Sequence, residues 1–242
     1  KTNLEDIYQE KTDIEHILDA PDTYIGSVES DKTVNWLLDE KNDMKHKEYD
    51  FIGGLYKCFD EGIVNCRDHV VRLMQKILKK EKNIIPVRNI EITINKETGV
   101  ITMMNDGNGV DVAKHPENQL WIPEMIFGHL RTSTNYKKDE KKIVGGKNGF
   151  GFKLVLIYSK WGEIETIDHV RGLKYKQRFE NNLDNIIKPS VRKCKTKPYT
   201  KVTFLPDYKR FGIENLTDDM FNLLKKRTYD IGAVTDKTVK VK

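Results

Sequence analysis

The longest regular pattern in the chain lies between residues 55 and 80, where apolar side chains recur at intervals of three and four. This spacing places them on one stripe of an α-helix. The stripe consists of Leu55, Phe59, Ile63, Cys66, Val70, Leu73 and Ile77. The opposite side of the same helix carries Glu61, Asn65, Asp68, His69 and Arg72. These polar residues form either an ordinary solvated face or one wall of a shared site.

Alternating apolar and polar residues predict a sheet in much of the remaining chain. Residues 89–95 form a half-buried strand, and residues 100–104 return as its antiparallel partner after a turn. Further strands are predicted at 162–169, 174–180, 191–196, 200–205 and 238–242. Helices are predicted at 121–130 and 216–229. The second of these helices is capped near Thr217. This order predicts an α+β fold, a two-layer sandwich whose mixed, mostly antiparallel sheet carries helices on one face.

The first fifty residues have a less regular pattern. A short helix is predicted at 13–18, with Asp13 as its cap and Pro21 ending it. Residues 23–27 are predicted as a strand that runs into a turn, and residues 39–47 as a hairpin or loop. We therefore divide the chain into an N-terminal arm with its leading segment, 1–26, and one domain, 27–242.

Composition narrows the class of protein only modestly. The 242 residues include 42 basic and 37 acidic ones, a formal charge of +5, which is compatible with work near nucleic acid without indicating it. Basic clusters at 76–82, 137–142 and 188–201 are interpreted as solvated surface. Three cysteines without metal-ligand spacing favour a reduced compartment. No segment has the length and hydrophobicity of a membrane span.

Residues 145–153 read Gly-Gly-Lys-Asn-Gly-Phe-Gly-Phe-Lys. Glycines let backbone N–H groups approach an anion closely and lysines supply positive charge, a composition that suits a loop over phosphates. The apolar residues 154–157 follow directly, which predicts a buried helix whose N-terminus faces the anion. The stretch is not a Walker A loop, because Phe152 stands where the lysine is required. A flexible surface loop is the alternative.

Glycines also occur at two places where their role is not obvious, directly after a predicted strand and inside the long predicted helix. The strand at 100–104 leads into Asn105-Asp106-Gly107-Asn108-Gly109, which is either a plain turn or a carboxylate at the base of a ligand site beside bare backbone. Gly62 stands in a helix interior, where it costs about 1 kcal/mol relative to alanine. We expect it to permit a close approach to the polar face of that helix.

Three segments in this order resemble the Bergerat-fold (GHKL) ATPases: Asp60-Glu61-x-x-x-Asn65, Asp106-Gly107-x-Gly109 and residues 145–153. Longer blocks resemble the N-terminal ATPase region of eukaryotic-type DNA topoisomerase II in particular. They lie at 18–27, 122–130, 133–136, 139–142, 199–204 and 210–212. The resemblance extends over nearly the whole chain.

The resemblance implies a role for each matching residue. Glu61 would be the general base that polarises the attacking water, and Asn65 would help to hold Mg²⁺. Asp106, with Gly109 beside it, would accept a hydrogen bond from the adenine amino group of ATP. Contacts to ribose and phosphate are implied for Ser133, Thr134 and Asn135. Backbone N–H groups of a lid over the nucleotide are implied for Gly146, Lys147, Asn148, Gly149, Phe150 and Gly151. The side chains of Lys147, Asn148 and Lys153 would lie near the phosphates. Lys153 is counted with Glu61 as catalytic, and Tyr8 would reach the nucleotide of a partner subunit.

The chain departs from the family pattern at four positions. The family commonly has asparagine at His69, arginine at Lys147, tyrosine at Phe150 and alanine at Phe152. Phe150 has no hydroxyl, so only its backbone role carries over. His69 is either a polar neighbour of the site or an exposed residue.

The function implied is ATP binding and hydrolysis that closes a homodimer by exchange of N-terminal arms, the gate through which the full-length enzyme passes double-stranded DNA. The family's transducer, cleavage and C-terminal domains are not recognised in these 242 residues. We therefore expect an ATPase region with slow hydrolysis and weak dimerisation. The alternatives are a nucleotide-dependent clamp without significant hydrolysis and a DNA-binding module; a histidine kinase fits less well. The expected location is the nucleus, with a virus particle or an organelle as alternatives.

Overall fold

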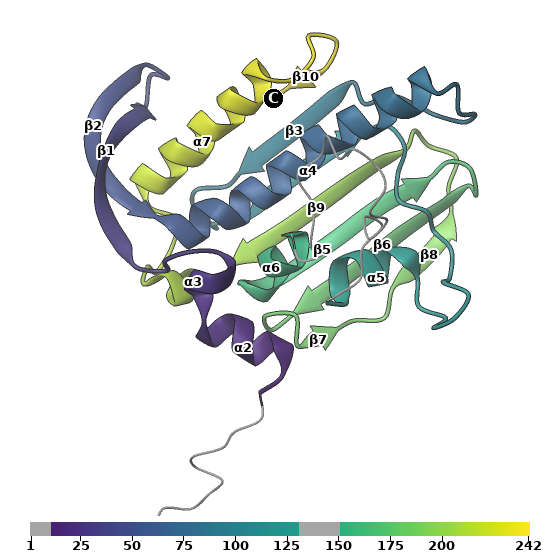
Figure 1. Ribbon diagram of the computed structural model, residues 1–242, viewed down its shortest axis with the longest axis horizontal. Helices are drawn as coiled ribbons and strands as arrows, with labels where there is room; N and C mark the ends of the chain where they lie inside the picture. Colours follow the sequence, from purple (N-terminus) through teal and green to yellow (C-terminus); the bar gives the residue numbers. More distant parts are fainter. Residues whose placement is uncertain (1–10, 131–150) are drawn as a thin grey trace, which may run out of the picture.

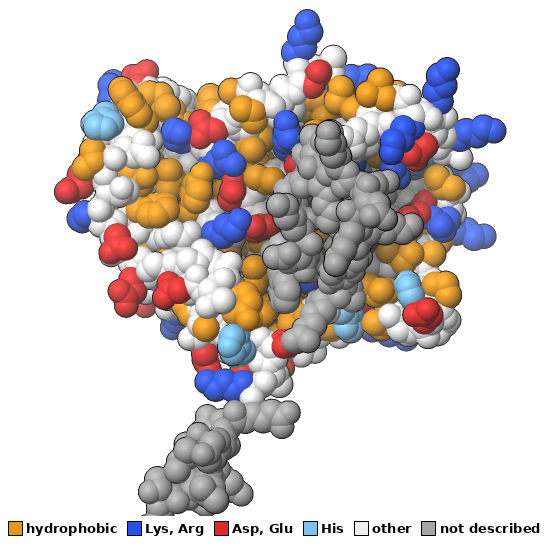
Figure 2. All heavy atoms as spheres, in the orientation of Figure 1, with side chains coloured by type: hydrophobic (Ala, Val, Ile, Leu, Met, Phe, Trp, Pro, Cys, Tyr) orange, Lys and Arg blue, Asp and Glu red, His pale blue; other side chains and the backbone are white. Residues whose placement is uncertain are grey.

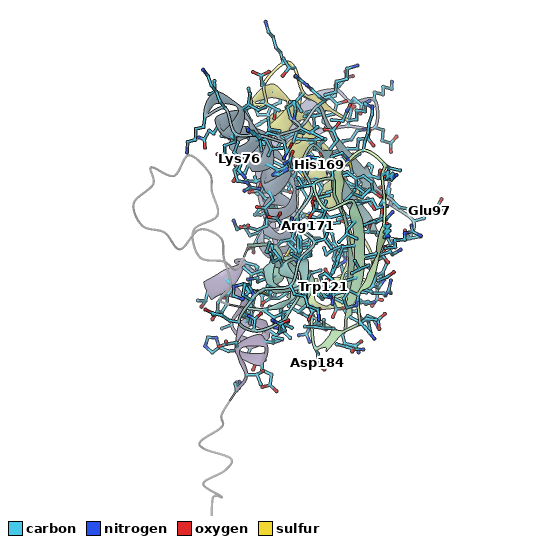
Figure 3. All side chains as sticks on the ribbon, turned by 90° about the vertical axis from the view of Figure 1, so that its right-hand side faces the viewer. Lys76, Glu97, Trp121, His169, Arg171 and Asp184 are labelled. Carbon is cyan, nitrogen blue, oxygen red and sulfur yellow. The ribbon has the colours of Figure 1, made fainter. Side chains whose placement is uncertain are left out.

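The computed structural model describes residues 11–130 and 151–242. They form two layers, a sheet and a set of helices that covers one of its faces (Figures 1 and 3). The helical segments are α2 (Asp13–Asp19), α3 (Pro21–Tyr24), α4 (Gly53–Leu78), α5 (Ile122–Gly128), α6 (Gly151–Ile157), the 3₁₀ turn η1 (Tyr208–Phe211) and α7 (Asp218–Ala233). The predicted α+β sandwich is confirmed.

The strands belong to a hairpin and a larger sheet. The hairpin consists of β1 (Ser30–Leu38) and β2 (Met44–Ile52). The sheet contains β3 (Asn89–Ile94), β4 (Ile101–Asp106), β5 (Ser159–Asp168), β6 (Leu173–Glu180), β7 (Asn185–Ile186), β8 (Ser190–Lys193), β9 (Tyr199–Pro206) and β10 (Lys240–Val241). Within the described residues its order is β10-β3-β4-β9-β5-β6-β7, with β8 pairing to β6. Only the β10–β3 pair among these is parallel, so the sheet is mixed and mostly antiparallel, as predicted.

Helix α4 lies across the sheet and buries its apolar stripe against it (Figure 1). Phe59 and Ile63 are fully buried there, together with Met103 of β4. Gly62 is buried on this sheet side, and a Cβ atom at Gly62 would collide with the sulfur of Met103. The close approach that Gly62 permits is therefore made by the sheet, not on the polar face of the helix as the sequence suggested.

The β1–β2 hairpin leans against α7 at one end of the molecule (Figure 1). Its inner face buries Leu37 and Tyr49, and Asp219 of α7 accepts hydrogen bonds from the Lys47 ammonium at 3.0 Å and the Asp50 N–H at 3.1 Å. The turn is held by Asp39, whose Oδ1 accepts the Lys41 and Asp43 N–H groups, both at 2.9 Å. Of the two alternatives for residues 39–47, the hairpin is correct.

Two predictions for the N-terminal segment are wrong. The cap of α2 is Thr12, not Asp13, because Thr12 and Glu15 form a reciprocal capping box. Residues 23–27 are not a strand: Pro21 opens a helical turn, and its carbonyl accepts the N–H of Ile25 at 2.8 Å. The segment packs onto the body of the molecule, where Ile17 is buried and its carbonyl accepts the Tyr158 hydroxyl at 2.5 Å.

Candidate functional site

The polar side of α4 is not a solvated face. Asp68 is buried, and Glu61, Asn65, His69 and Arg72 are all partly buried. A helix face of this polarity that is withdrawn from water needs partners in the protein or a ligand. The structure therefore favours the second interpretation of the pattern, a wall of a shared site.

The Glu61 carboxylate has a fixed orientation. Its Oε1 lies 2.5 Å from the ammonium of Lys57, one helical turn earlier, and its side chain is 24% exposed. Its Oε2 is turned toward the start of α6, since a Cβ atom built on Gly151 would lie only 2.9 Å from it. The acid of the long helix and the described end of the glycine-rich stretch therefore lie side by side, as the family resemblance implies.

Asn65 lies one turn further along α4 and faces the same point. The position of a Cβ on Gly151 is 4.0 Å from the Asn65 Nδ2 atom. The side-chain amide and the Glu61 carboxylate thus line the same side of α6. Any side chain at Gly151 would intrude between them, which explains a glycine at the first residue of a helix.

The Asp106 carboxylate at the end of β4 is engaged by the chain beside it. Its Oδ1 accepts the N–H groups of Arg88 at 2.6 Å and Asn89 at 2.9 Å, and its Oδ2 accepts the Asn89 side-chain amide at 2.7 Å. These bonds tie the start of β3 to the end of β4. They also use much of the capacity of this carboxylate to accept further hydrogen bonds.

Asn105, the neighbour of Asp106 in β4, is a buried polar residue that sequence reasoning did not single out. Successive residues of a strand point to opposite faces, and β4 buries Ile101, Met103 and Asn105 on the helix side. Asn105 is 5% exposed and faces the layer that contains Glu61, whereas Asp106 points to the other face. The sequence could have shown this through the alternation of β4. If the strand continues to residue 106, Asn105 lies on the same face as the buried Met103.

Gly109 makes room for β5. A Cβ at Gly109 would collide with the carbonyl oxygen of Ile167 and lie 2.8 Å from the Thr166 hydroxyl. That hydroxyl also accepts the Val110 N–H at 2.9 Å. The missing side chain at Gly109 is therefore accounted for by contact with the protein itself, and this contact fixes the loop after β4 to the sheet.

His69 connects α4 to the same loop. Its Nε2–H donates to the Asn108 carbonyl at 2.7 Å, while its Nδ1 lies 3.4 Å from the Arg72 guanidinium and is placed to accept from it. Burial and the neighbouring Arg72 charge lower the pKa of His69 to about 4. Of the two alternatives for His69, the structure favours the polar neighbour of the site.

The amino-acid sequence of this chain is similar to those of known DNA topoisomerase 2 proteins. A DNA topoisomerase 2 of Acanthamoeba polyphaga mimivirus is 46% identical over 243 residues, which cover 98% of this chain and 18% of that relative. The Saccharomyces cerevisiae DNA topoisomerase 2 is 43% identical over 237 residues, 97% of this chain and 16% of the relative. The chain thus spans less than a fifth of the length of these curated relatives. A comparison with protein-family models gave no match.

Solved structures agree in fold. The ATPase region of Saccharomyces cerevisiae topoisomerase II superposes with a TM-score of 0.86 and 42% identity, covering 94% of this chain and 58% of that one. The ATPase and transducer domains from Balamuthia mandrillaris superpose with a TM-score of 0.85 and 37% identity, covering 95% and 58%. The chain belongs to the ATPase region of the DNA topoisomerase II family. The 43K ATPase domain of Thermus thermophilus gyrase B, 18% identical with a TM-score of 0.61, shares the fold alone.

Phe152 is one of the positions where this topoisomerase II ATPase region departs from the family pattern. Its ring is buried between Phe127 and Phe204, edge-on to each, with centroid distances of 5.6 and 6.0 Å. Such pairs add to the stabilisation from burial. The phenylalanine therefore joins α5, α6 and β9 in the core, and its role is in packing.

Lys153 follows Phe152 in α6 and is buried to 2% exposure. Burial lowers the pKa of Lys153 to about 8. The helix itself, Gly151–Ile157, is buried from Phe152 onward, which confirms the buried helix predicted from residues 154–157. A buried ammonium of this kind is costly without an anionic or polar neighbour.

The remaining predicted site residues lie outside the described residues. They are Tyr8, Ser133, Thr134, Asn135, Gly146, Lys147, Asn148, Gly149 and Phe150. Within residues 11–130 and 151–242, no three His, Cys, Asp or Glu side chains are grouped so as to hold a metal ion. In the same part of the chain, no helix combines the length and the hydrophobicity that crossing a membrane requires.

Proposed function

We propose that this chain binds ATP with Mg²⁺ and hydrolyses it, and that this cycle closes and reopens the N-terminal gate of a type II DNA topoisomerase. The observation that carries the proposal is the placement of Glu61. One of its oxygens is bound by Lys57, and the other is turned toward the glycine-rich stretch where a triphosphate is expected. Membership of the topoisomerase II ATPase family supports the same conclusion.

Glu61 is proposed as the general base. A carboxylate held on one side by an ammonium keeps its second oxygen available to accept a proton from a water molecule. Phosphoryl transfer needs positioning and charge neutralisation more than covalent chemistry. The helix α4 supplies the positioning, since its apolar stripe is fixed in the core and its polar face is fixed by His69 and Arg72.

The residues near Glu61 fit a magnesium ion. Mg²⁺ in nucleotide sites is usually held by one or two protein oxygens together with phosphates and water, so a cluster of three protein ligands is not required. Asn65 offers a side-chain carbonyl oxygen on the same side of α6 as Glu61. The bound ion would neutralise charge on the phosphates.

At the other end of the site, Asp106 and Asn105 are both proposed to face the base of the nucleotide. The resemblance favours Asp106, whereas burial on the helix side of the sheet favours Asn105. Gly109 fixes the loop that follows. The ribose and phosphate contacts of Ser133, Thr134 and Asn135, and those of Gly146, Lys147, Asn148, Gly149, Phe150, Gly151 and Lys153, rest on the family resemblance.

The activity of the whole protein is also part of the proposal. Two copies would exchange their N-terminal arms on binding ATP, and DNA passes through the gate in the full-length enzyme. The names of the relatives support DNA as the partner. A nuclear location stays a prediction of the resemblance.

A single-turnover assay tests the proposal against its main rival. Excess protein is mixed with labelled ATP and Mg²⁺, and product is followed in parallel with the sedimentation coefficient. We expect dimers that form with ATP and dissociate as product appears. Dimers that persist with intact ATP would establish the nucleotide-dependent clamp instead. A steep salt dependence of DNA binding that ignores ATP would favour the DNA-binding module.

A further inference from the structure

One edge of the sheet carries a group of cations that the nucleotide site does not use. We call Lys188, Arg192, Lys193, Lys195 and Lys197 the basic edge. All five are exposed, and no acidic residue lies between Asn185 and Pro198. The segment includes β8 and the turn that leads to β9. Strand β8 lies on the right-hand side of Figure 1, the side that Figure 3 turns toward the viewer.

These cations are not neutralised by the protein. In the described part of the chain, none of the five takes part in an ion pair, although such pairs are common elsewhere on the sheet. The acids on the adjoining open face are already engaged: Glu165 pairs with Lys174 and Lys201, and Glu163 pairs with Lys176. The basic edge therefore keeps an uncompensated positive charge.

The sheet holds these charges in place. Strand β8 pairs with β6 along one side, and the N–H of Cys194 donates to the Gly172 carbonyl at 2.8 Å. The register puts Arg192 opposite Lys174, on the open face, and Lys193 opposite Leu173, toward the helix side. Positive charge therefore flanks the edge on both sides. Pro198, just past the last cation, is buried and anchors the segment.

The charge of the basic edge suits a polyanion. Double-stranded DNA carries one negative charge per about 1.7 Å of its axis, so a duplex lying along this edge would present phosphates to the exposed cations. A peptide that adds to a sheet edge needs a long free strand and pockets for alternate side chains, and β8 has only four residues.

We propose that the basic edge binds the sugar–phosphate backbone of double-stranded DNA without regard to sequence. The proposal rests on the proposed function, because it names a surface through which the ATPase region itself would contact the DNA. It adds a docking surface distant in sequence from Glu61 and from the arm.

The test uses the whole chain and a labelled 20-base-pair duplex, with fluorescence anisotropy measured over a range of salt concentrations. The triple variant Arg192→Gln, Lys193→Gln, Lys195→Gln removes three charges from the basic edge. The matched control Lys79→Gln, Lys80→Gln, Lys82→Gln removes three exposed charges beyond α4. Figure 2 shows Lys and Arg side chains projecting along the right-hand margin, where both β8 and the end of α4 lie in Figure 1.

We expect the basic-edge variant to lose about tenfold or more in affinity at low salt. Its plot of log affinity against log salt should become shallower by up to about three, while the control keeps the slope of the unmodified chain. Equal losses in the two variants, or unchanged binding in the first, would overturn the proposal. So would tighter binding of polyglutamate than of DNA, which would identify an acidic protein segment as the partner.

ATP turnover without DNA separates this proposal from the proposed function. The basic-edge variant should hydrolyse ATP like the unmodified chain and melt at the same temperature. If it does so and still binds DNA normally, only the basic edge is wrong. If the unmodified chain does not turn over ATP at all, the proposed function fails, whatever the DNA measurements give.

Discussion

Two glutamates, one on each side of the sheet, show how differently this molecule uses a carboxylate. Glu165 of β5 lies on the open face with only 9% of its side chain exposed. The ammonium groups of Lys174 and Lys201 lie 3.0 and 3.2 Å from it, and the Tyr199 hydroxyl donates to it. Glu61 of α4 lies on the helix-covered side, is 24% exposed, and has an ion pair with Lys57.

The difference lies in what remains unused on each carboxylate. Burial by itself would raise the pKa of Glu165, but bonds from Tyr199, Lys174 and Lys201 outweigh it and lower the pKa to about 2. Both oxygens of Glu165 are engaged, so this group stabilises the sheet. On Glu61 the oxygen turned toward Gly151 is not the one that Lys57 holds. The molecule thus separates a structural carboxylate from one placed for chemistry.

The largest expected effect is on turnover in Glu61→Gln. Loss of a general base typically costs 10²- to 10⁴-fold, so we expect kcat for ATP to fall by roughly that factor while the amide still allows nucleotide to bind. Steady-state hydrolysis and equilibrium binding of a fluorescent ATP analogue measure the two quantities. The matched control is Glu163→Gln, since Glu163 is 23% exposed and also pairs with one lysine, Lys176, at 3.0 Å. Hydrolysis at the unmodified rate in Glu61→Gln would refute the assignment.

The converse effect is expected in Glu165→Gln. Removing this charge leaves Lys174, only 15% exposed, without its anionic partner, which costs about 3 kcal/mol of unfolding free energy. Turnover per folded molecule should stay unchanged. Urea denaturation at pH 7 measures the loss. A Glu165→Gln variant that is as stable as the unmodified chain but has a reduced kcat would show that Glu165 serves turnover and not stability.

The same group should govern stability in acid. An unfolded glutamate takes up its proton near pH 4.5, whereas native Glu165 resists until about pH 2. The unfolded state therefore binds more protons in this window, and stability is present above pH 4.5 and lost as the pH falls toward 2. The difference corresponds to about 3 kcal/mol. Chemical denaturation at pH 5 and pH 3 should show about 2 kcal/mol of this loss in the unmodified chain and a smaller one in Glu165→Gln.

His69, on the side of the sheet that carries the site, should cause a second and separate loss of stability as the pH falls. Unfolded histidine takes up a proton near pH 6.5, but native His69 only near pH 4. Because the unfolded state binds more protons between these values, stability should fall as the pH drops from 6.5 to 4, by up to about 3 kcal/mol. The variant His69→Asn should no longer show this loss of stability between pH 6.5 and pH 4, but should keep the loss below pH 4.5 that Glu165 causes. Identical profiles for both proteins would contradict the role of His69 as a buried neutral bridge.

The smallest expected effect tests whether Lys57 orients Glu61. In Lys57→Met we expect kcat to fall about tenfold, corresponding to about 1.4 kcal/mol, with KM for ATP little changed, because the partner of the ammonium is the Glu61 carboxylate. The variant Lys57→Arg should recover most of the rate. A rise in KM with unchanged kcat would show that Lys57 binds nucleotide instead.

Much of the architecture could be predicted from the sequence, for a local reason. The spacing of the apolar residues predicted α4, the strand patterns predicted β3–β6 and β8–β10, and Thr217 was correctly placed as the cap of α7. A hairpin was one of two alternatives for residues 39–47, but the strands β1 (30–38) and β2 (44–52) were not predicted over their full lengths. Their residues are largely charged or exposed, and the few buried ones, such as Leu37 and Tyr49, gain their burial from α7, a partner far along the chain.

The sequence by itself determined most of the secondary structure and the presence of an acid and an amide one turn apart on a long helix. Only the tertiary structure decided what that helix faces. Packing of α6 against α4 brought Gly151 to Glu61, and the pleat of β4 turned Asn105 inward and Asp106 outward. Contact with β5 explained Gly109, and the loop after β4 gave His69 its acceptor. Helical and strand periods are local properties, whereas the choice of neighbour depends on how distant elements share one core.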